Sequence, residues 1–339
     1  MLTPNRVGLT KKEYGGAAST LCTGCGHDSI TLHIISAFYE LNIEPNRVAK
    51  FSGIGCSSKT PAYFLSRAHG FNSVHGRMQS VATGAAAANR HMINIAVSGD
   101  GDTASIGMGQ FVHVLRRNLP LLYVVENNGV YGLTKGQFSA TSDRGSAMKK
   151  GDVNKFESID LCSMAIDLGC GFVGRSFSGD AKQMVPLLKG GLRHRGLAFL
   201  DVISPCITFN NHEGSTKSYK FMKDNHQLIH EIGFVPSYTP IEVDYAPGTV
   251  KTVQLPDGSH ITLKKIERDY DPTNRKAALD LLVEAEEKGI FLTGLFYVDP
   301  NSVPFQDVEK LSQTPLVEMS MDTLRPPESV LTEIMNELK

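Results

Sequence analysis

Two short apolar segments, each ending in small and polar residues, most constrain how this chain can fold. Residues 92–98 (MINIAVS) end at the run GDGD, residues 99–102, and residues 120–126 (PLLYVVE) end at the run NNG, residues 127–129. A helical pattern, TASIGMGQFVHVLRR, lies between them. Uninterrupted apolar strands joined by a helix are typical of parallel strands buried on both faces. The sequence therefore predicts a strand–helix–strand unit with polar residues where each strand ends.

Similar units before and after this one predict the fold class. A strand is expected from Val48 to about residue 54, and a helix of small residues over 77–91. Further helices are expected over 29–41 and 158–168, and strands near 171–174 and 197–203. Alternating strands and helices favour an α/β fold with a doubly wound, mostly parallel sheet.

The sequence changes in character from about residue 212. A β-hairpin is expected over 252–263 around Pro256-Asp257-Gly258, then a helix from Asp271-Pro272-Thr273 to about Lys288 and a strand over 289–298. A last amphipathic helix should follow Pro326-Pro327. We expect two parts: residues 1–211, carrying the cofactor-type motifs, and an α+β extension over 212–339.

Composition excludes several classes of protein. Lys and Arg (34) nearly balance Asp and Glu (35), which argues against binding nucleic acid through bulk charge. No apolar run approaches the ~20 residues of a membrane span, and the first residues lack the apolar stretch of a secretory signal. We therefore expect a cytoplasmic protein with neither a membrane nor a nucleic acid as partner. The low charged fraction, 20%, is consistent with a buried subunit interface.

The polar residues that follow the two apolar strands form a candidate magnesium–diphosphate site. Carboxyl ends of neighbouring parallel strands meet at one edge of a sheet, where ligands bind in open α/β folds. Asp100, the amide of Asn128 and the carbonyl of Val130 offer the oxygen ligands that Mg²⁺ prefers. Gly99 and Gly101 let the backbone approach phosphate groups.

The same segment also fits a second ligand. Gly99-x-Gly101-x-x-Ala104 matches a dinucleotide-binding pattern, and Glu126 ends the next strand where a ribose-binding acid would lie. Asp100 argues against this alternative, because its carboxylate would repel a pyrophosphate unless a cation lay between them. A plain glycine-rich turn and an Asn-Gly turn are the simplest alternative.

Six cysteines raise the question of a metal centre. Cys22 and Cys25 form a C-x-x-C pair, and Cys56 and Cys206 each follow a predicted strand. Four thiolates from separate segments suit either zinc or one [4Fe–4S] cluster. Cys162 and Cys170 are expected to be ordinary buried thiols, which is also the alternative for the other four.

Several motifs resemble one family. GDGD, then 25 residues, then NNGVYGLTKGQ resembles the thiamine-diphosphate motif of the β subunits of 2-oxoacid:ferredoxin oxidoreductases. The motifs CTGCGH, GIGCSSK, HGR and SPC agree with that family in identity and order, over about residues 20–215. LPDG, DYDPTNR and TGLFYV in the extension resemble it too.

The resemblance implies a pyrophosphate-type thiamine-binding fold and three cofactors. They are thiamine diphosphate, Mg²⁺ held by Asp100, Asn128 and the Val130 carbonyl, and one [4Fe–4S] cluster. The implied cluster ligands are Cys22, Cys25, Cys56 and Cys206. The expected cofactor-binding residues are Gly55, Cys56, Ser57, Ser58, His75, Gly99, Asp100, Gly101, Asp102, Asn128, Val130, Gly132 and Leu133. For His75 a structural role at a helix start is the alternative.

The implied reaction converts a 2-oxoacid, CoA and oxidised ferredoxin into acyl-CoA, CO₂ and reduced ferredoxin, in either direction. Thiamine enzymes generally also use a carboxylate on the aminopyrimidine, and that group belongs to a domain type we do not find here. We therefore expect an obligate partner α subunit. Two alternatives are a non-oxidative thiamine decarboxylase or synthase subunit and a zinc-stabilised nucleotide-binding regulatory protein.

Four residues are candidates for substrate recognition: Lys59, Leu133, Thr134 and Lys135. A lysine near the reaction site could pair with the distal carboxylate of 2-oxoglutarate, whereas pyruvate would leave it without a partner. We therefore expect 2-oxoglutarate rather than pyruvate. The alternatives are lysines that face solvent, CoA phosphates or the partner subunit.

Overall fold

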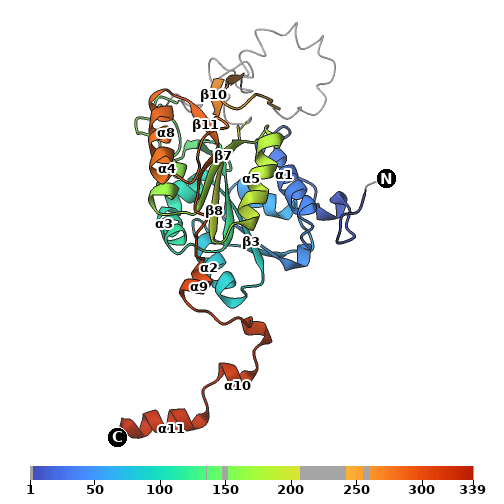
Figure 1. The fold of residues 1–339 in the computed structure, drawn as a ribbon, viewed down its shortest axis with the longest axis vertical. Coiled ribbons are helices and arrows are strands. Elements are labelled where there is room, and N and C mark those ends of the chain that lie inside the picture. The colour runs from blue at the N-terminus through green and yellow to red at the C-terminus, as the bar shows by residue number, and fades with distance from the viewer. Residues whose placement is uncertain (1–2, 135, 147–151, 207–241, 255–259, 339) are drawn as a thin grey trace.

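A nine-stranded sheet forms the centre of the computed structural model, which describes residues 3–134, 136–146, 152–206, 242–254 and 260–338 (Figure 1). The strand order is β2-β1-β3-β4-β8-β7-β11-β10-β9. The strands are β1 Val48–Ser52, β2 His69–Asn72, β3 Ile93–Gly99, β4 Leu121–Asn127, β7 Phe172–Phe177, β8 Leu197–Ile203, β9 Val250–Gln254, β10 His260–Lys265 and β11 Phe291–Val298. A separate pair consists of β5 Val130–Tyr131 and β6 Gln137–Phe138.

The six strands from β2 to β7 run parallel, which confirms the predicted mostly parallel sheet. Helices cover both faces (Figure 1). On one face, α1 and α5 pack against one set of alternate strand residues. On the other, α2, α3, α4 and α8 pack against the opposite set. The helices are α1 Gly26–Glu40, α2 Met78–Ala88, α3 Met108–Arg116, α4 Leu161–Asp167, α5 Ala181–Arg193 and α8 Arg275–Glu287.

Within the nine-stranded sheet and the helices that cover it, the sequence analysis missed one strand and one helix, and one further helix differs from the prediction. Strand β2 is exposed along its length and lacks an apolar pattern. Helix α5 contains Pro186 and a Gly190-Gly191 pair, which obscure its helical pattern. A Cβ at Gly191 would lie 2.8 Å from Leu122, so the glycine allows the helix to approach the sheet. The helix expected from Thr103 begins instead as a π-helical segment, η4 (Gly101–Ile106), which precedes α3.

The C-terminal extension continues the same sheet. Strands β9 and β10 are antiparallel, as the predicted hairpin requires, although its turn lies outside the described residues. Strand β11 pairs antiparallel with β7. The proposed boundary between residues 211 and 212 also lies outside the described residues. The expected last helix is present as α11 (Glu328–Glu337) and projects from the body of the protein (Figure 1). It buries no residue, and neither do the two short helices before it, η5 (Leu316–Glu318) and α10 (Met321–Leu324). The remaining short C-terminal helix is α9 (Phe305–Val308).

The parallel strands bring the polar motifs to one edge. Strands β1, β3, β4 and β8 are consecutive in the sheet. Their carboxyl ends lead into residues 53–59, 99–102, 127–129 and 204–206 respectively. In the described part of the chain, no helix is long and apolar enough to cross a membrane.

Candidate cofactor site

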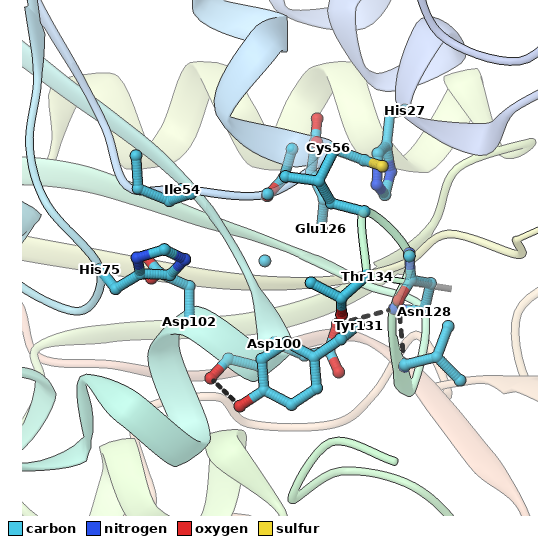
Figure 2. A pocket seen from close by; sticks show the side chains of 17 residues that line it. His27, Ile54, Cys56, His75, Asp100, Asp102, Glu126, Asn128, Tyr131 and Thr134 are labelled. Atoms are coloured by element: carbon cyan, nitrogen blue, oxygen red, sulfur yellow. Dashed lines mark hydrogen bonds and ion pairs between the residues drawn. The ribbon is translucent and has the colours of Figure 1, made fainter. Parts of the chain in front are cut away.

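A pocket lies at the carboxyl edge of the sheet, where these motifs meet (Figure 2). Its wall comes from segments that are far apart in the sequence. The lining residues are His27, Ile54, Gly55, Cys56, Ser57, His75, Gly99, Asp100, Gly101, Asp102, Glu126, Asn128, Val130, Tyr131, Gly132, Leu133 and Thr134.

All of the predicted cofactor-binding residues line this pocket except Ser58. The Ser58 hydroxyl instead donates to the Gly55 carbonyl at 2.6 Å, within its own turn. Of the predicted substrate residues, Leu133 and Thr134 lie on the wall and Lys59 does not. Lys135 lies outside the described residues.

Asp100 lies at the centre of the candidate magnesium site and is 1% exposed. Its Oδ1 accepts a hydrogen bond from the Asn128 backbone N–H at 3.2 Å, and its Oδ2 accepts bonds from Thr141 Oγ1, at 2.8 Å, and from Ser139 Oγ. Burial raises the pKa of Asp100, and these donors act in the opposite direction. The sequence analysis missed Ser139 and Thr141, because nothing in the polar sequence around them indicates that their hydroxyls reach Asp100.

The oxygen atoms gathered around Asp100 suit a magnesium ion. Asn128 Oδ1 accepts from the backbone N–H of Val130 at 3.1 Å, so the amide and the residue 130 backbone lie in one tight turn. Carboxylate, amide and carbonyl oxygens are the hard donors that Mg²⁺ takes alongside phosphate oxygens.

Two glycines shape the pocket floor beside Asp100. A Cβ at Gly99 would lie 2.9 Å from Ser57 Oγ, and one at Gly101 would lie 2.5 Å from the Tyr131 ring. The Tyr131 hydroxyl also donates to the Gly101 carbonyl at 3.0 Å. Glycine at these two positions therefore lets the pocket residues Ser57 and Tyr131 pack directly against the backbone on either side of Asp100.

Asp102 supports the pocket wall. Its Oδ1 accepts from the backbone N–H of Gly76 at 2.8 Å, and its Oδ2 accepts from Ser98 Oγ at 2.9 Å. Gly76 has φ +63°, and a Cβ there would lie 2.6 Å from the Gly107 backbone. These contacts hold the loop of His75 against η4 and keep the His75 side chain on the pocket wall.

Two buried side chains, His27 and Glu126, form the wall near Cys56 (Figure 2). The Nδ1 atom of His27 is 2.7 Å from Ser204 Oγ. Burial lowers the pKa of His27 to about 4 and raises the pKa of Glu126 well above its usual range. The sequence analysis considered Glu126 only as a ribose-binding acid, and it included His27 only as the last residue of the CTGCGH motif. Their placement on the wall depends on the meeting of α1 with the ends of β4 and β8.

The four candidate cluster cysteines approach the same edge. Cys25 precedes the first residue of α1, Gly26, where a Cβ would lie 2.5 Å from Ser204 Oγ. This contact places Cys25 close to the segment of Cys206. Burial raises the pKa of Cys25, and the nearby Cys206 adds to the shift; burial likewise raises the pKa of Cys56, with Cys22 adding to it.

The thiols do not form a ready-made ligand shell. Over the described ranges, no three Cys, His, Asp or Glu side chains are close enough to hold a metal ion. None of the six cysteines forms a disulfide bond. Soft thiolates from separate segments at one edge still have the chemistry that an iron–sulfur cluster requires. Cys162 and Cys170 differ, because both are 0% exposed in the hydrophobic core.

Two family models match the chain. The model described as "Thiamine pyrophosphate enzyme, C-terminal TPP binding domain" matches residues 53–202. A model for the C-terminal part of the pyruvate ferredoxin oxidoreductase beta subunit matches residues 260–313, in the extension. The first match contains most of the pocket and favours thiamine over the dinucleotide alternative.

Named relatives agree with these matches. A β subunit of 2-oxoacid:ferredoxin oxidoreductase 1 from Aeropyrum pernix is 34% identical over 87% of this chain and 82% of its own length. A 2-oxoglutarate synthase subunit, KorB, from Methanocaldococcus jannaschii is 36% identical over 60% of this chain and 77% of its own length.

A solved structure is similar over nearly the whole chain. It is a 2-oxoglutarate:ferredoxin oxidoreductase from Magnetococcus marinus with 2-oxoglutarate, coenzyme A and succinyl-CoA bound. The TM-score is 0.74 at 26% identity, over 98% of each chain. On the strength of the long A. pernix match and the thiamine-type fold, this chain belongs to the family of 2-oxoacid:ferredoxin oxidoreductase β subunits.

Proposed function

We propose that this chain binds thiamine diphosphate, Mg²⁺ and one [4Fe–4S] cluster, and that with an α subunit it oxidatively decarboxylates 2-oxoglutarate. The products would be succinyl-CoA and CO₂, with electrons passed to ferredoxin, in a reversible reaction. The observation that carries this proposal is the position of Cys56. It lines the same pocket as Asp100 and Asn128, so one cavity wall carries both types of ligand.

The chain's own residues would hold the diphosphate end of the cofactor. Asp100, Asn128 and the Val130 carbonyl would bind Mg²⁺, and the cation would offset the charge between Asp100 and the phosphates. His75 lies on the wall where it can donate a hydrogen bond to a phosphate oxygen.

The four cysteines Cys22, Cys25, Cys56 and Cys206 would hold the cluster. When bound, thiamine diphosphate provides a carbon nucleophile for 2-oxoacids, and an iron–sulfur cluster exchanges single electrons. Buried His27 and Glu126 would exclude water from the wall beside Cys56. The cysteine set argues against a non-oxidative thiamine enzyme, which needs no electron acceptor.

A partner subunit would complete the site. The described residues include no second domain to provide a carboxylate for the aminopyrimidine, and we assign that group and much of the CoA site to the α subunit. Three apolar side chains in the segments that form the pocket are exposed, as expected of a face buried in an assembly. They are Val74 (70%), Ile106 (45%) and Leu133 (54%).

The proposed substrate rests on the relatives and on chemistry at the pocket mouth. Two of the relatives described above are named for 2-oxoglutarate. Lys59 lies in η3 (Ser57–Ala62), two residues after the pocket residue Ser57, and would face the substrate's distal carboxylate in the site completed by the α subunit. Pyruvate is the alternative substrate, in keeping with the description of the matching C-terminal family.

One experiment tests the proposal as a whole. The chain is co-expressed with its α subunit and purified without oxygen, then analysed for iron, thiamine diphosphate and visible absorption. Reduction of ferredoxin is next measured with 2-oxoglutarate and with pyruvate, each with and without CoA. We expect about four irons per chain and ferredoxin reduction that needs both 2-oxoglutarate and CoA. A colourless, zinc-containing protein with full activity would contradict the proposal.

A further inference from the structure

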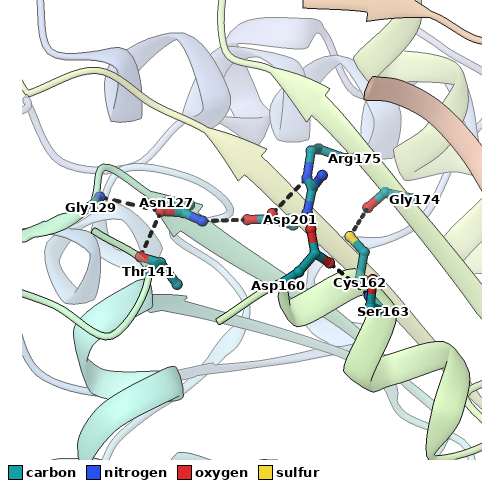
Figure 3. A network of polar contacts seen from close by, with 9 residues as sticks. All are labelled: Asn127, Gly129, Thr141, Asp160, Cys162, Ser163, Gly174, Arg175 and Asp201. Atoms are coloured by element: carbon teal, nitrogen blue, oxygen red, sulfur yellow. Dashed lines mark hydrogen bonds and ion pairs between the residues drawn. The ribbon is translucent and has the colours of Figure 1, made fainter. Parts of the chain in front are cut away.

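A line of buried polar side chains connects the middle of the sheet to the candidate magnesium loop (Figure 3). Arg175 on β7 is 6% exposed, and Asp201 on the neighbouring strand β8 is 2% exposed. The Arg175 Nε donates to Asp201 Oδ2 at 2.9 Å. The other carboxylate oxygen, Oδ1, accepts from the side-chain amide of Asn127 at 3.0 Å. Both oxygens of Asp201 are therefore occupied by donors.

Asn127 transmits this contact to the loop. It is the last residue of β4, and its Oδ1 accepts from the backbone N–H of Gly129 and from Thr141 Oγ1, each at 3.2 Å. The single hydroxyl hydrogen of Thr141 is shared between this oxygen and the closer acceptor, Asp100 Oδ2, at 2.8 Å. A single side chain thus contacts the turn that carries Asn128 and one of the hydroxyls that hold Asp100.

The direction of the Asn127 amide is the important point. An asparagine side chain has a donor end and an acceptor end, and only one orientation satisfies the loop. An ionised aspartate can only accept, so Asp201 fixes the NH₂ group toward the sheet and leaves the oxygen toward Gly129. The Arg175 guanidinium balances the buried charge of Asp201.

We propose that Asp201 is a positioning residue for the magnesium loop, acting through Asn127 and held in place by Arg175. By fixing the Asn127 amide, it holds Asn128 and the Val130 carbonyl in the arrangement that binds the cation. This inference rests on the proposed thiamine diphosphate–Mg²⁺ site.

The chain offers a matched control in Asp160. Its Oδ2 accepts from Arg175 Nη2 at 2.6 Å, and its Oδ1 accepts from the Ser163 backbone N–H at 2.7 Å, at the start of α4. Asp160 thus contacts the same arginine as Asp201, but its described hydrogen bonds do not include Asn127 (Figure 3). Asp160→Asn tests loss of a charged partner of Arg175, whereas Asp201→Asn also places an amide NH₂ against Asn127 or Arg175.

A side-chain exchange gives the sharpest test. In the double variant Asn127→Asp/Asp201→Asn, the amide introduced at position 201 can donate to the carboxylate introduced at position 127. That carboxylate can still accept from Gly129 and Thr141, and the amide oxygen at position 201 can accept from Arg175. The double variant has the same number of charged side chains as the wild type. If it regains wild-type Mg²⁺ affinity, the affinity depends on which side chain donates and which accepts between positions 127 and 201.

The measurement is Mg²⁺ binding by calorimetry, made on the assembled αβ protein after removal of bound metal and cofactor, with thiamine diphosphate then added in excess. We expect Asp201→Asn to weaken Mg²⁺ binding about tenfold or more, the scale of losing a residue that orients a metal ligand. Asp160→Asn should lower the melting temperature and leave Mg²⁺ affinity within about threefold of wild type. The double variant Asn127→Asp/Asp201→Asn should regain the Mg²⁺ affinity that Asp201→Asn loses. If Asp201→Asn does not fold, Asn127→Ala provides the same test, because it leaves the Arg175–Asp201 pair intact.

Two results would overturn the assignment. One is an equal loss of Mg²⁺ affinity in Asp201→Asn and Asp160→Asn, which would indicate a purely structural role. The other is unchanged affinity in Asp201→Asn or its substitute Asn127→Ala. A wild-type protein that binds no thiamine diphosphate with Mg²⁺ would overturn the proposed function itself, and the two failures are distinguished by that wild-type titration.

Discussion

The imidazole Nδ1 of His27 lies 3.6 Å from a carboxyl oxygen of Glu126, and both side chains are essentially unexposed. The separation suits an ion pair, but burial opposes charge on both groups: it lowers the pKa of His27 to about 4 and raises that of Glu126. Burial thus disfavours the charged form of both groups. Such a wall beside Cys56 keeps the local dielectric low, which strengthens the charge interactions proposed in the pocket.

The neutral state of His27 predicts a pH dependence of stability. Its pKa is about 4 in the folded chain, against 6.5 for a solvated histidine. Between these values the unfolded chain binds the extra proton, so stability should fall as the pH falls from 6.5 to 4. Thermal melts of wild type and His27→Gln over this range should show a steeper decline in wild type. The raised pKa of Glu126 acts in the opposite direction but is present in both proteins.

The same measurement provides a control at higher pH. Above about pH 6.5, where His27 is neutral in both the folded and the unfolded chain, the melting temperatures of wild type and His27→Gln should change with pH in parallel. Parallel curves throughout the acid range would instead show that His27 is as readily protonated in the folded chain as in water.

Removing the Asp100 carboxylate should remove the cation site. Asp100→Ala takes away the only charged protein ligand proposed for Mg²⁺ and removes the carboxylate that accepts hydrogen bonds from the hydroxyls of Ser139 and Thr141. We expect Mg²⁺-dependent thiamine diphosphate binding to weaken by more than about 100-fold, measured by calorimetry. Asp167→Ala, at an exposed aspartate, should bind as wild type does. Normal cofactor affinity in Asp100→Ala, or tight NAD binding by wild type, would contradict the assignment.

The cysteines should separate into two groups. Serine at position 22, 25, 56 or 206 should lower the iron content and the visible absorption of anaerobically purified protein, because each proposed ligand comes from a loop at the pocket edge. Cys162→Ser and Cys170→Ser serve as controls. Their buried hydroxyls should lower the melting temperature, while iron per folded chain stays at the wild-type value. Loss of iron from either control, or retention in all four ligand variants, would refute the proposed ligand set.

The substrate prediction concerns Lys59. In the αβ complex we expect a higher kcat/KM for 2-oxoglutarate than for pyruvate. Lys59→Ile should reduce kcat/KM for 2-oxoglutarate by the factor that corresponds to about 1.5–3 kcal/mol of transition-state binding, the usual contribution of a hydrogen bond to a charged group. It should reduce kcat/KM for pyruvate much less. An exposed lysine such as Lys276, which pairs with Asp280, provides the matched Lys→Ile control. A native preference for pyruvate, or an equal loss with both acids, would exclude this assignment.

The sequence by itself predicted the parallel sheet and most of the pocket wall. Uninterrupted apolar strands can only be buried on both faces, and parallel strands bring their carboxyl ends to one edge. These two constraints were sufficient to place Asp100, Asn128 and Cys56 in one cavity. Ser58 is the predicted cofactor-binding residue that does not line the pocket, because in a tight turn a serine hydroxyl readily bonds the local backbone, here the Gly55 carbonyl.

Only the tertiary structure decided which distant side chains complete the site. Ser139 and Thr141 reach Asp100 because the segment after β5 folds back over η4, and His27 reaches Glu126 because α1 begins against Ser204. The pairing of Arg175 with Asp201 arises from the position of β7 beside β8 in the sheet. Strand order and loop paths depend on packing between segments far apart in the chain. Local patterns of apolar and polar residues do not predict that long-range packing.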